Sequence, residues 1–207
     1  MMQLETDRLI LRGWNPPVDA QQAFDIYGDP AVTCWIGSGV ADANWYETQA
    51  RLQRYCDRNS PPGSVWAVIE KAIDRIIGTV LLVPLPLTSS VGGRLQSISP
   101  TSSVSLLPVS DPPLEMEIGW HFRRASWGYG YATEAARCAL DYGLTHFSEI
   151  YAVALPDNYR SISVMQRLGM RDLGKTQRYY GGQTLALFCL TAAEHQLAVS
   201  LSSTGGA

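Results

Sequence analysis

The chain has 207 residues, of which 46% are hydrophobic and 17% charged, and its formal net charge is −3. This length suits one domain with a sizeable core, and the charge balance lacks the basic footprint of a nucleic-acid-binding protein. No apolar run approaches the ~18 residues of a membrane span, and the N-terminus has no signal-peptide core. We therefore expect a cytoplasmic protein that binds neither nucleic acid nor membranes.

Cysteine and histidine residues are scattered along the chain. Cys34, Cys56, Cys138 and Cys189 form no closely spaced pair, and the three histidines are equally dispersed. Protein metal sites usually show ligands at short, regular spacings. We expect no metal site, and four thiols kept reduced in the cytoplasm.

The first half of the chain reads as a strand, two helices and a hairpin. Pro16-Pro17 interrupts the chain after the first strand, and Asp19 is suited to cap the helix that follows. Asp29-Pro30 is expected to end that helix, because the residue before proline avoids the helical conformation. The expected elements are a strand at 9–14, helices at 20–27 and 42–59, and hairpin strands at 64–71 and 75–83.

Residues 84–113 are rich in Ser and Pro and almost free of charge. Such a composition buries little apolar surface, so the segment is predicted to be a loop inserted between two strands of a sheet, with a short strand at 103–107. A loop of this length is usually either functional or disordered. We favour disorder over a substrate-binding role.

The second half alternates strands and helices. At 115–122, Met116, Ile118, Trp120 and Phe122 share one face of a strand, and Glu115, Glu117, Gly119 and His121 share the other. The further elements expected are helices at 133–147 and 161–168, a strand at 150–155, and hairpin strands at 175–180 and 185–190. The pattern predicts one mixed α/β domain over residues 1–191, with helices covering a sheet. Residues 192–207 are expected to be a partly disordered tail.

A glycine turn separates the strand at 115–122 from the helix that follows. It reads Trp127-Gly128-Tyr129-Gly130-Tyr131-Ala132-Thr133-Glu134-Ala135. The first N–H groups of a helix lack internal partners and carry partial positive charge, and glycine lets the backbone approach a phosphate closely. A pyrophosphate cradle and a turn that only serves tight packing both fit the glycines. A nucleotide-triphosphate loop does not, because Tyr131 stands where that loop needs lysine.

The order and spacing of several segments resemble the GNAT acetyltransferase superfamily, and within it the ribosomal-protein N-terminal acetyltransferases. The resemblance spans nearly the whole chain. The segments that carry it are Leu4 to Arg12, Asp29 to Val32, Glu117 to Trp120, Trp127 to Ala135, Asn158 to Met165, and Leu168 to Met170. It implies a mostly antiparallel, splayed sheet of about seven strands flanked by helices, with acetyl-CoA as co-substrate and no metal.

The same resemblance implies where acetyl-CoA binds. Backbone N–H groups of the turn would hold its pyrophosphate, and free backbone groups of the splayed strand would pair with its pantetheine arm. Asn158 resembles the family's asparagine that contacts the arm. The implied cofactor-binding residues are Trp120, His121, Phe122, Gly128, Tyr129, Gly130, Tyr131, Ala132, Thr133 and Asn158. Trp127 stands where the family has a charged or amide residue, so the backbone N–H groups must supply more of the phosphate contacts. Arg123 and Arg124 either assist there or are simply solvated.

The resemblance also implies three chemical tasks, which are deprotonating the amine, holding an oxyanion and protonating the leaving sulfur. We expect Glu117 to be the catalytic base, with Glu115 on the same face as the alternative. Ser161 is the candidate acid, although a serine there could instead cap its helix. Tyr159 and Tyr180 are weaker acid candidates.

The acceptor is inferred from amine basicity. An α-amino group has a pKa of about 7.7–8.0 and a lysine about 10.4, so a modest base such as Glu117 suits a protein N-terminus. A small amine such as an antibiotic, a polyamine or an amino-acid derivative remains the alternative, as does a CoA-binding module without turnover. Trp14, Trp35, Trp45 and Tyr46 either wall the acceptor site or pack in the core. A homodimer is left open.

Overall fold

The computed structural model describes residues 3–57, 62–87 and 115–204. Most of the predicted insertion, including the short strand expected at 103–107, lies outside the described residues. In the described part of the chain, no helix combines the length and apolar character needed to cross a membrane.

The protein is built on one eight-stranded sheet with the strand order β1-β2-β3-β4-β5-β6-β8-β7. The strands are β1 (Leu4–Glu5), β2 (Leu9–Gly13), β3 (Ser64–Glu70), β4 (Arg75–Pro84), β5 (Met116–Phe122), β6 (Glu149–Ala154), β7 (Arg171–Thr176) and β8 (Leu185–Thr191). Neighbouring strands run antiparallel except for β5 and β6, which are parallel. The mixed α/β architecture predicted from the sequence is confirmed, with one strand more than the approximate seven.

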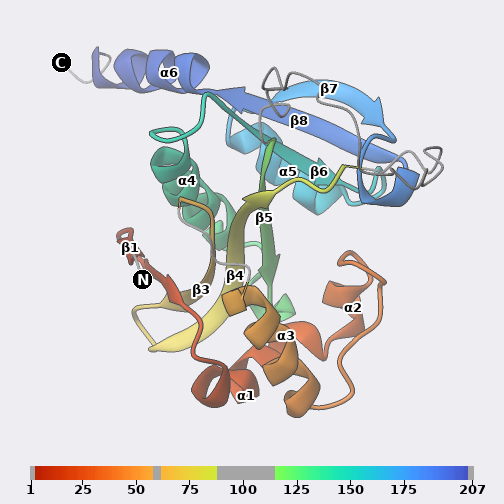
Figure 1. Ribbon diagram of the computed structural model, residues 1–207. Helices are drawn as coiled ribbons and strands as arrows, with labels where there is room; N and C mark the ends of the chain where they lie inside the picture. Colours follow the sequence, from red (N-terminus) through yellow and green to blue (C-terminus); the bar gives the residue numbers. More distant parts are fainter. Residues whose placement is uncertain (1–2, 58–61, 88–114, 205–207) are drawn as a thin grey trace, which may run out of the picture.

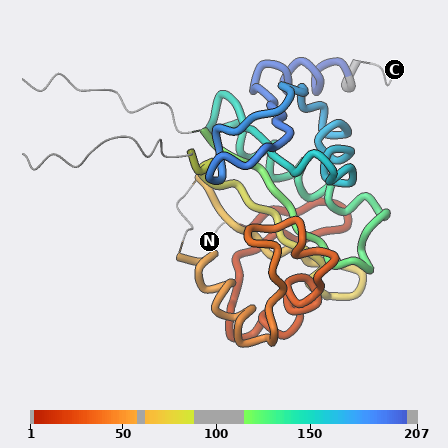
Figure 2. Tube along the Cα trace, turned by 90° about the vertical axis from the view of Figure 1, so that its right-hand side faces the viewer, coloured from red at the N-terminus to blue at the C-terminus, as the bar shows by residue number. Residues whose placement is uncertain are grey.

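Helices cover both faces of the sheet (Figure 1). The α-helices are α1 (Pro16–Tyr27), α2 (Pro30–Thr33), α3 (Trp45–Asp57), α4 (Tyr131–Gly143), α5 (Tyr159–Arg167) and α6 (Ala192–Thr204). Strand β3 shows how one sequence serves two cores. Val65, Ala67 and Ile69 pack with α1 and α3, whereas Trp66 and Val68 pack on the opposite face with α4. The two-residue period of the strand produces this division. Figure 2 shows α1 and α3 at one end of the molecule and β7 and β8 at the other.

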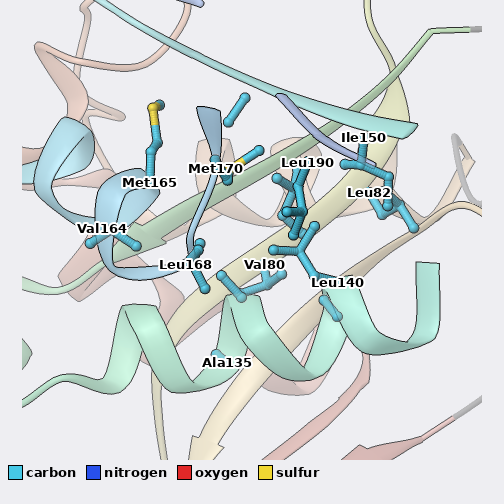
Figure 3. Packing of buried hydrophobic residues seen from close by; sticks show 14 of the residues in the cluster. Val80, Leu82, Ala135, Leu140, Ile150, Val164, Met165, Leu168, Met170 and Leu190 are labelled. Atoms are coloured by element: carbon cyan, nitrogen blue, oxygen red, sulfur yellow. The ribbon is translucent and has the colours of Figure 1, made fainter. Parts of the chain in front are cut away.

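Helix α4 packs close to the sheet because its inward face is made of small residues (Figure 3). The residues predicted for that face are all buried: Ala135, Ala136, Ala139, Leu140 and Gly143. A Cβ atom at Gly143 would lie 2.7 Å from Cδ1 of Ile150 and 2.9 Å from Cδ2 of Leu82. These distances are too short for real contacts, so a larger residue would force the ends of the Ile150 and Leu82 side chains to move. This packing fixes the N-terminal end of α4 relative to β5.

Helix α1 begins earlier than predicted. Proline was expected to interrupt the chain, but Pro16 and Pro17 occupy the first helical positions, where a missing N–H costs nothing and the fixed φ suits a helix. Asp19 is therefore not the N-cap. Its buried carboxylate accepts a hydrogen bond from Asn15 N at 2.7 Å and pairs with Arg12 at 2.7 Å.

Three further boundaries differ from the predictions. Asp29-Pro30 starts the short helix α2 as well as ending α1, because the Asp29 side chain accepts the N–H of Ala31. The first strand of the last hairpin is Arg171–Thr176 instead of 175–180, since β7 pairs with β8 from Arg171 onward. Residues 192–204, expected to be part of a frayed tail, form α6 directly after β8.

Candidate active site

The glycine turn after β5 adopts a backbone that requires glycine. It follows the short 3-10 helix η1 (Arg124–Ser126), and Gly128 and Gly130 have φ angles of 86° and 82°. L-residues with a side chain rarely adopt such angles. A Cβ atom at Gly128 would meet no heavy atom within 4 Å. The glycines therefore serve the path of the backbone, not close packing, so the packing interpretation of this turn is not supported.

The N-terminus of α4 is open. Gly130 is its N-cap residue and provides no side-chain hydrogen bond. Among the described residues, the first N–H group after Trp127 to find a backbone acceptor is that of Glu134, which bonds to the Gly130 carbonyl at 3.0 Å. The N–H groups of residues 128–133 are thus available to an outside acceptor. A row of free donors at a helix N-terminus suits an anionic group such as a diphosphate.

Strands β5 and β6 separate in the way that the resemblance implied. In the described structure they are registered at a single pair, Glu117 and Tyr151. On its other edge, β5 pairs with β4 along its whole length, from Met116 to Phe122. The β6-facing edge of β5 at Trp120, His121 and Phe122 therefore has no strand partner among the described residues, but the Phe122 carbonyl accepts a hydrogen bond from Trp127 Nε1 at 2.8 Å. Unpaired strand edges can accept an extended, amide-bearing chain.

A cavity of about 1810 Å³ joins this edge to the glycine turn and to the helices of the other half. Every predicted catalytic and cofactor-binding residue lines it. These residues are Glu117, Trp120, His121, Phe122, Gly128, Tyr129, Gly130, Tyr131, Ala132, Thr133, Asn158 and Ser161. The fold thus brings together residues from β5, the turn, α4 and α5.

Glu117 is the buried carboxyl group of this cavity. Its side chain is 7% exposed, and the Tyr180 hydroxyl donates a hydrogen bond to Oε2. Burial raises the pKa of Glu117 to about 7, and the hydrogen bond from Tyr180 acts in the opposite direction. Desolvation disfavours the ionised carboxylate, whereas a donated hydrogen bond favours it. A carboxyl group with this pKa exchanges protons readily near neutral pH.

Glu115 lies on the same face of the sheet but has different partners. It accepts hydrogen bonds from the Tyr179 hydroxyl at 2.9 Å and from Arg178 Nη2 at 3.0 Å. Glu115 is not among the residues that line the cavity. Of the two carboxyl groups, only Glu117 lines the cavity, and Glu115 is held by Tyr179 and Arg178.

The connection between β7 and β8 supplies all of these partners. Tyr180, in the 3-10 helix η2 (Tyr180–Gly182), has a positive φ of 51°, which is uncommon for a residue with a side chain. Its N–H bonds to the Pro86 carbonyl at 3.2 Å, and Tyr179 packs with Leu85. The described start of the predicted insertion is therefore part of the wall that holds Tyr180 against Glu117.

His121 is a neutral neighbour of the cavity. Its Nδ1 lies 3.4 Å from the Tyr27 hydroxyl, which also contacts the Thr79 hydroxyl at 2.7 Å. Burial and the nearby charge of Arg51 lower the pKa of His121 to about 4. The imidazole is therefore uncharged at neutral pH and would not repel a cationic acceptor.

At the N-terminus of α5, the structure decides between two interpretations of Ser161. The helix begins at Tyr159, and the side chain of Asn158 accepts the N–H of Ser161 at 3.2 Å. Asn158 is therefore the cap, and the interpretation of Ser161 as an N-cap is wrong. Among the described residues, the Ser161 hydroxyl has no hydrogen-bond partner. It remains available to the cavity.

The other candidates divide between the cavity and the surface. Arg123 bonds to Ser126 Oγ at 2.9 Å and Arg124 pairs with Asp29 at 3.2 Å, and neither lines the cavity. Of the four aromatics suggested for the acceptor wall, Trp35 lines the cavity, whereas Trp14 is a core residue. Trp45 and Tyr46 stack on each other outside the cavity. In the described chain, no group of three or more His, Cys, Asp or Glu could hold a metal ion.

Sequence reasoning did not single out Arg8, a residue that lines the cavity. Its side chain pairs with Glu134 in the first turn of α4 and donates to the Tyr129 carbonyl. Before the fold was known, Arg8 was noted only as part of the segment from Leu4 to Arg12, which was interpreted as a strand. The contact spans 126 residues, so no local pattern could reveal it.

The sequence and the fold both match known proteins. The "Acetyltransferase (GNAT) domain" family matches residues 8–171. The uncharacterized N-acetyltransferase p20 of Bacillus licheniformis is 35% identical over 183 residues, which cover 86% of this chain and 88% of that protein. The uncharacterized protein YkkB of Bacillus subtilis is 30% identical over 173 residues, or 81% and 84% of the two chains.

A solved structure shares the fold at low sequence identity. RimL, described as a ribosomal L7/L12 alpha-N-protein acetyltransferase in complex with coenzyme A, aligns with a TM-score of 0.67. The alignment covers 93% of this chain and 99% of that one, with 10% identity. The chain therefore belongs to the GNAT acetyltransferase family, and it is an acetyl-CoA-dependent acyltransferase.

Proposed function

We propose that the protein transfers the acetyl group of acetyl-CoA to the α-amine of a protein N-terminus. The observation that carries this proposal is the buried Glu117, whose pKa of about 7 lies close to that of an α-amine. An α-amine has a pKa of about 7.7–8.0, so its proton would pass to Glu117 at a cost of roughly 1 kcal/mol. For a lysine, with a pKa of about 10.4, the same transfer would cost nearly 5 kcal/mol.

The residues of the cavity fit acetyl-CoA. The free N–H groups from Gly128 to Thr133 would hold its diphosphate, and the open edge of β5 would hold its amide-bearing arm. The Asn158 side chain lines the cavity beside them, although its oxygen caps α5. When bound, acetyl-CoA supplies the acetyl group as a reactive thioester.

The catalytic residues would then move two protons. Glu117 takes a proton from the incoming amine, with the Tyr180 hydroxyl holding the carboxylate in place. The Ser161 hydroxyl, at the start of α5, gives a proton to the sulfur as the C–S bond breaks and regains one from the amine nitrogen as the amide forms, while Glu117 releases its proton to solvent. Glu117 is buried and already hydrogen-bonded to Tyr180, so the base needs little rearrangement during the reaction.

The charge of the cavity favours a singly charged acceptor. Helix α3 contributes Arg51 and Arg54 to the lining. Among the described residues Arg51 is paired with Asp42 at 2.6 Å, whereas Arg54 has no acidic partner, so the Arg54 guanidinium would repel a polyamine or an aminoglycoside, both of which carry several positive charges. A peptide N-terminus brings a single positive charge, which disappears when Glu117 takes the proton. RimL, which shares the fold, is described as acting on such an α-amine.

The test is an acceptor panel with acetyl-CoA as donor. It contains ribosomal-protein N-terminal peptides, the same peptides with blocked N-termini and a free lysine, polyamines and aminoglycosides. We expect turnover with the free N-termini and none with the blocked peptides. Turnover with polyamines or aminoglycosides but with no peptide would replace this proposal by small-amine acetylation. Tight CoA binding without turnover of any acceptor would indicate a binding module.

A further inference from the structure

Arg8 reaches the glycine turn from the opposite end of the chain. It lies between β1 and β2, and Figure 1 shows β1 beside α4. Its Nε and Nη2 lie 2.7 and 2.5 Å from Glu134 Oε2, and its Nη1 donates to the Tyr129 carbonyl at 3.2 Å. The guanidinium also sits 4.5 Å from the centre of the Tyr131 ring. Arg8 therefore touches the turn and the first helical turn of α4 at three positions.

Glu134 is the reason why this contact matters for an anion. A carboxylate in the first turn stabilises the helix by its interaction with the dipole, but it also places negative charge where we propose that a diphosphate binds. Burial alone would raise the pKa of Glu134, but hydrogen bonds from Thr6 and Arg8 outweigh burial and the pKa is lowered. Glu134 is therefore ionised, and without Arg8 it would repel an incoming phosphate.

Arg8 also keeps donors to spare. A guanidinium has five N–H groups, and three of them point to Glu134 and Tyr129. The side chain is 48% exposed and lines the cavity. Its Nη2 lies 3.7 Å from the position that a Cβ would take at Gly130, so the free N–H groups are next to the open N-terminus of α4. The turn itself carries Trp127 where the family pattern has a charged or amide residue.

We propose that Arg8 is a diphosphate-binding residue, which cancels the charge of Glu134 and donates its remaining N–H groups to the diphosphate of coenzyme A. The proposal rests on the cofactor placement given above. In this proposal Arg8, from the N-terminal segment, supplies the positive charge that Trp127 does not provide in the glycine turn. Charge-assisted, fork-shaped donation is the contact that guanidinium groups make best with phosphates.

The first experiment is calorimetric titration of wild type and Arg8→Gln with coenzyme A, dephospho-coenzyme A and pantetheine. We expect Arg8→Gln to weaken both diphosphate-containing ligands by about 10- to 100-fold, as the loss of a charged hydrogen bond implies, and to leave pantetheine unaffected. A loss confined to coenzyme A would assign Arg8 to the 3′-phosphate and overturn the diphosphate contact. Arg75→Gln, which removes an equally exposed arginine paired with Asp25 outside the cavity, is the control.

The second experiment separates charge cancellation from a merely structural link. Adding Glu134→Gln to Arg8→Gln should recover coenzyme A affinity by about three- to tenfold, because the unpaired carboxylate is removed. A structural link alone predicts no recovery, equal losses for pantetheine and coenzyme A, and a lower melting temperature in both variants; that pattern would overturn the proposal. If wild type binds coenzyme A but acetylates no amine, the proposed acceptor is wrong. The affinity measurements still test whether Arg8 binds the diphosphate.

Discussion

The N-termini of two helices line the same cavity. They differ in whether a side chain of the protein caps their first N–H groups. At α5, the Asn158 side chain takes up the N–H of Ser161, which fixes the start of the helix from within the protein. At α4, Gly130 offers no side chain, and the N–H groups up to Thr133 are left for an outside acceptor. A capped terminus holds its residues in position, whereas an open one is suited to bind an anion. Glu117 lies on β5, which ends at the turn leading to α4.

The two helix ends separate cofactor binding from proton transfer. The largest expected effect is the loss of turnover in Glu117→Gln. The variant removes the base without touching the open N-terminus of α4. We expect kcat to fall by about 10²- to 10⁴-fold, with unchanged coenzyme A affinity in calorimetry. Full turnover of the variant between pH 6 and 9 would exclude Glu117 as the base.

The same variant has a consequence for stability. Glu117 has a higher pKa in the folded protein than the ordinary carboxyl value of 4.5. The folded state therefore holds its proton more tightly, and stability is lost as pH rises from about 4.5 through about 7. Glu117→Gln should weaken this loss, so we expect a higher melting temperature than wild type at pH 8 and little difference at pH 4. A lower melting temperature at pH 8 would show that the carboxylate is stabilised in its site.

Gly130→Asp tests the open terminus directly. It places a carboxylate beside the free N–H groups, so we expect coenzyme A affinity to fall by about 100-fold or more, since facing like charges cost several kcal/mol. Gly130→Ala is the control for the positive φ of 82° at this position. Equal affinity losses in the two variants would mean that backbone strain, not charge, weakens binding. Unchanged affinity in Gly130→Asp would reject the diphosphate placement.

Asn158→Ala tests the capped terminus. The loss of the side-chain cap should lower the free energy of unfolding by about 1 kcal/mol, the usual value of an N-cap. Ser161→Ala, which removes a hydroxyl that makes no cap, should leave the stability nearly unchanged while slowing turnover. Denaturant titration and steady-state kinetics measure the two quantities. If Ser161→Ala costs as much stability as Asn158→Ala, the assignment of the cap to Asn158 is wrong.

The smallest effect is expected from Tyr180→Phe. The hydrogen bond from Tyr180 lowers the Glu117 pKa, so its removal should raise that pKa and move the acid limb of the pH profile of kcat/KM to higher pH. At neutral pH we expect a loss of roughly threefold to tenfold, in keeping with one hydrogen bond. Tyr159→Phe, which alters an exposed tyrosine of the same cavity, should leave the profile unchanged. An unmoved acid limb in Tyr180→Phe would contradict the contact.

Local patterns were enough to predict the main elements of the site. The alternation along β5 predicted which side chains face the core, and the small residues of α4 predicted its close packing on the sheet. The glycine turn predicted an open helix N-terminus. These features depend on residues close in sequence, whose geometry follows from the period of a strand or a helix. The roles assigned to individual residues in binding and catalysis stay predictions.

Tertiary structure decided what local patterns left open. The sequence could not choose between Glu115 and Glu117, because their partners come from the β7–β8 connection, which is 63 residues from Glu117. The contact of Arg8 with Glu134 spans 126 residues and has no local signature. The pairing of β7 and the formation of α6 also depended on neighbours far along the chain. Sequence by itself determined the family, the elements and the helix end open to an anion, because these follow from short-range geometry. Only the folded chain decided which carboxyl group is buried and which cation stands beside the glycine turn, because burial and charge pairing depend on residues brought together from its distant parts.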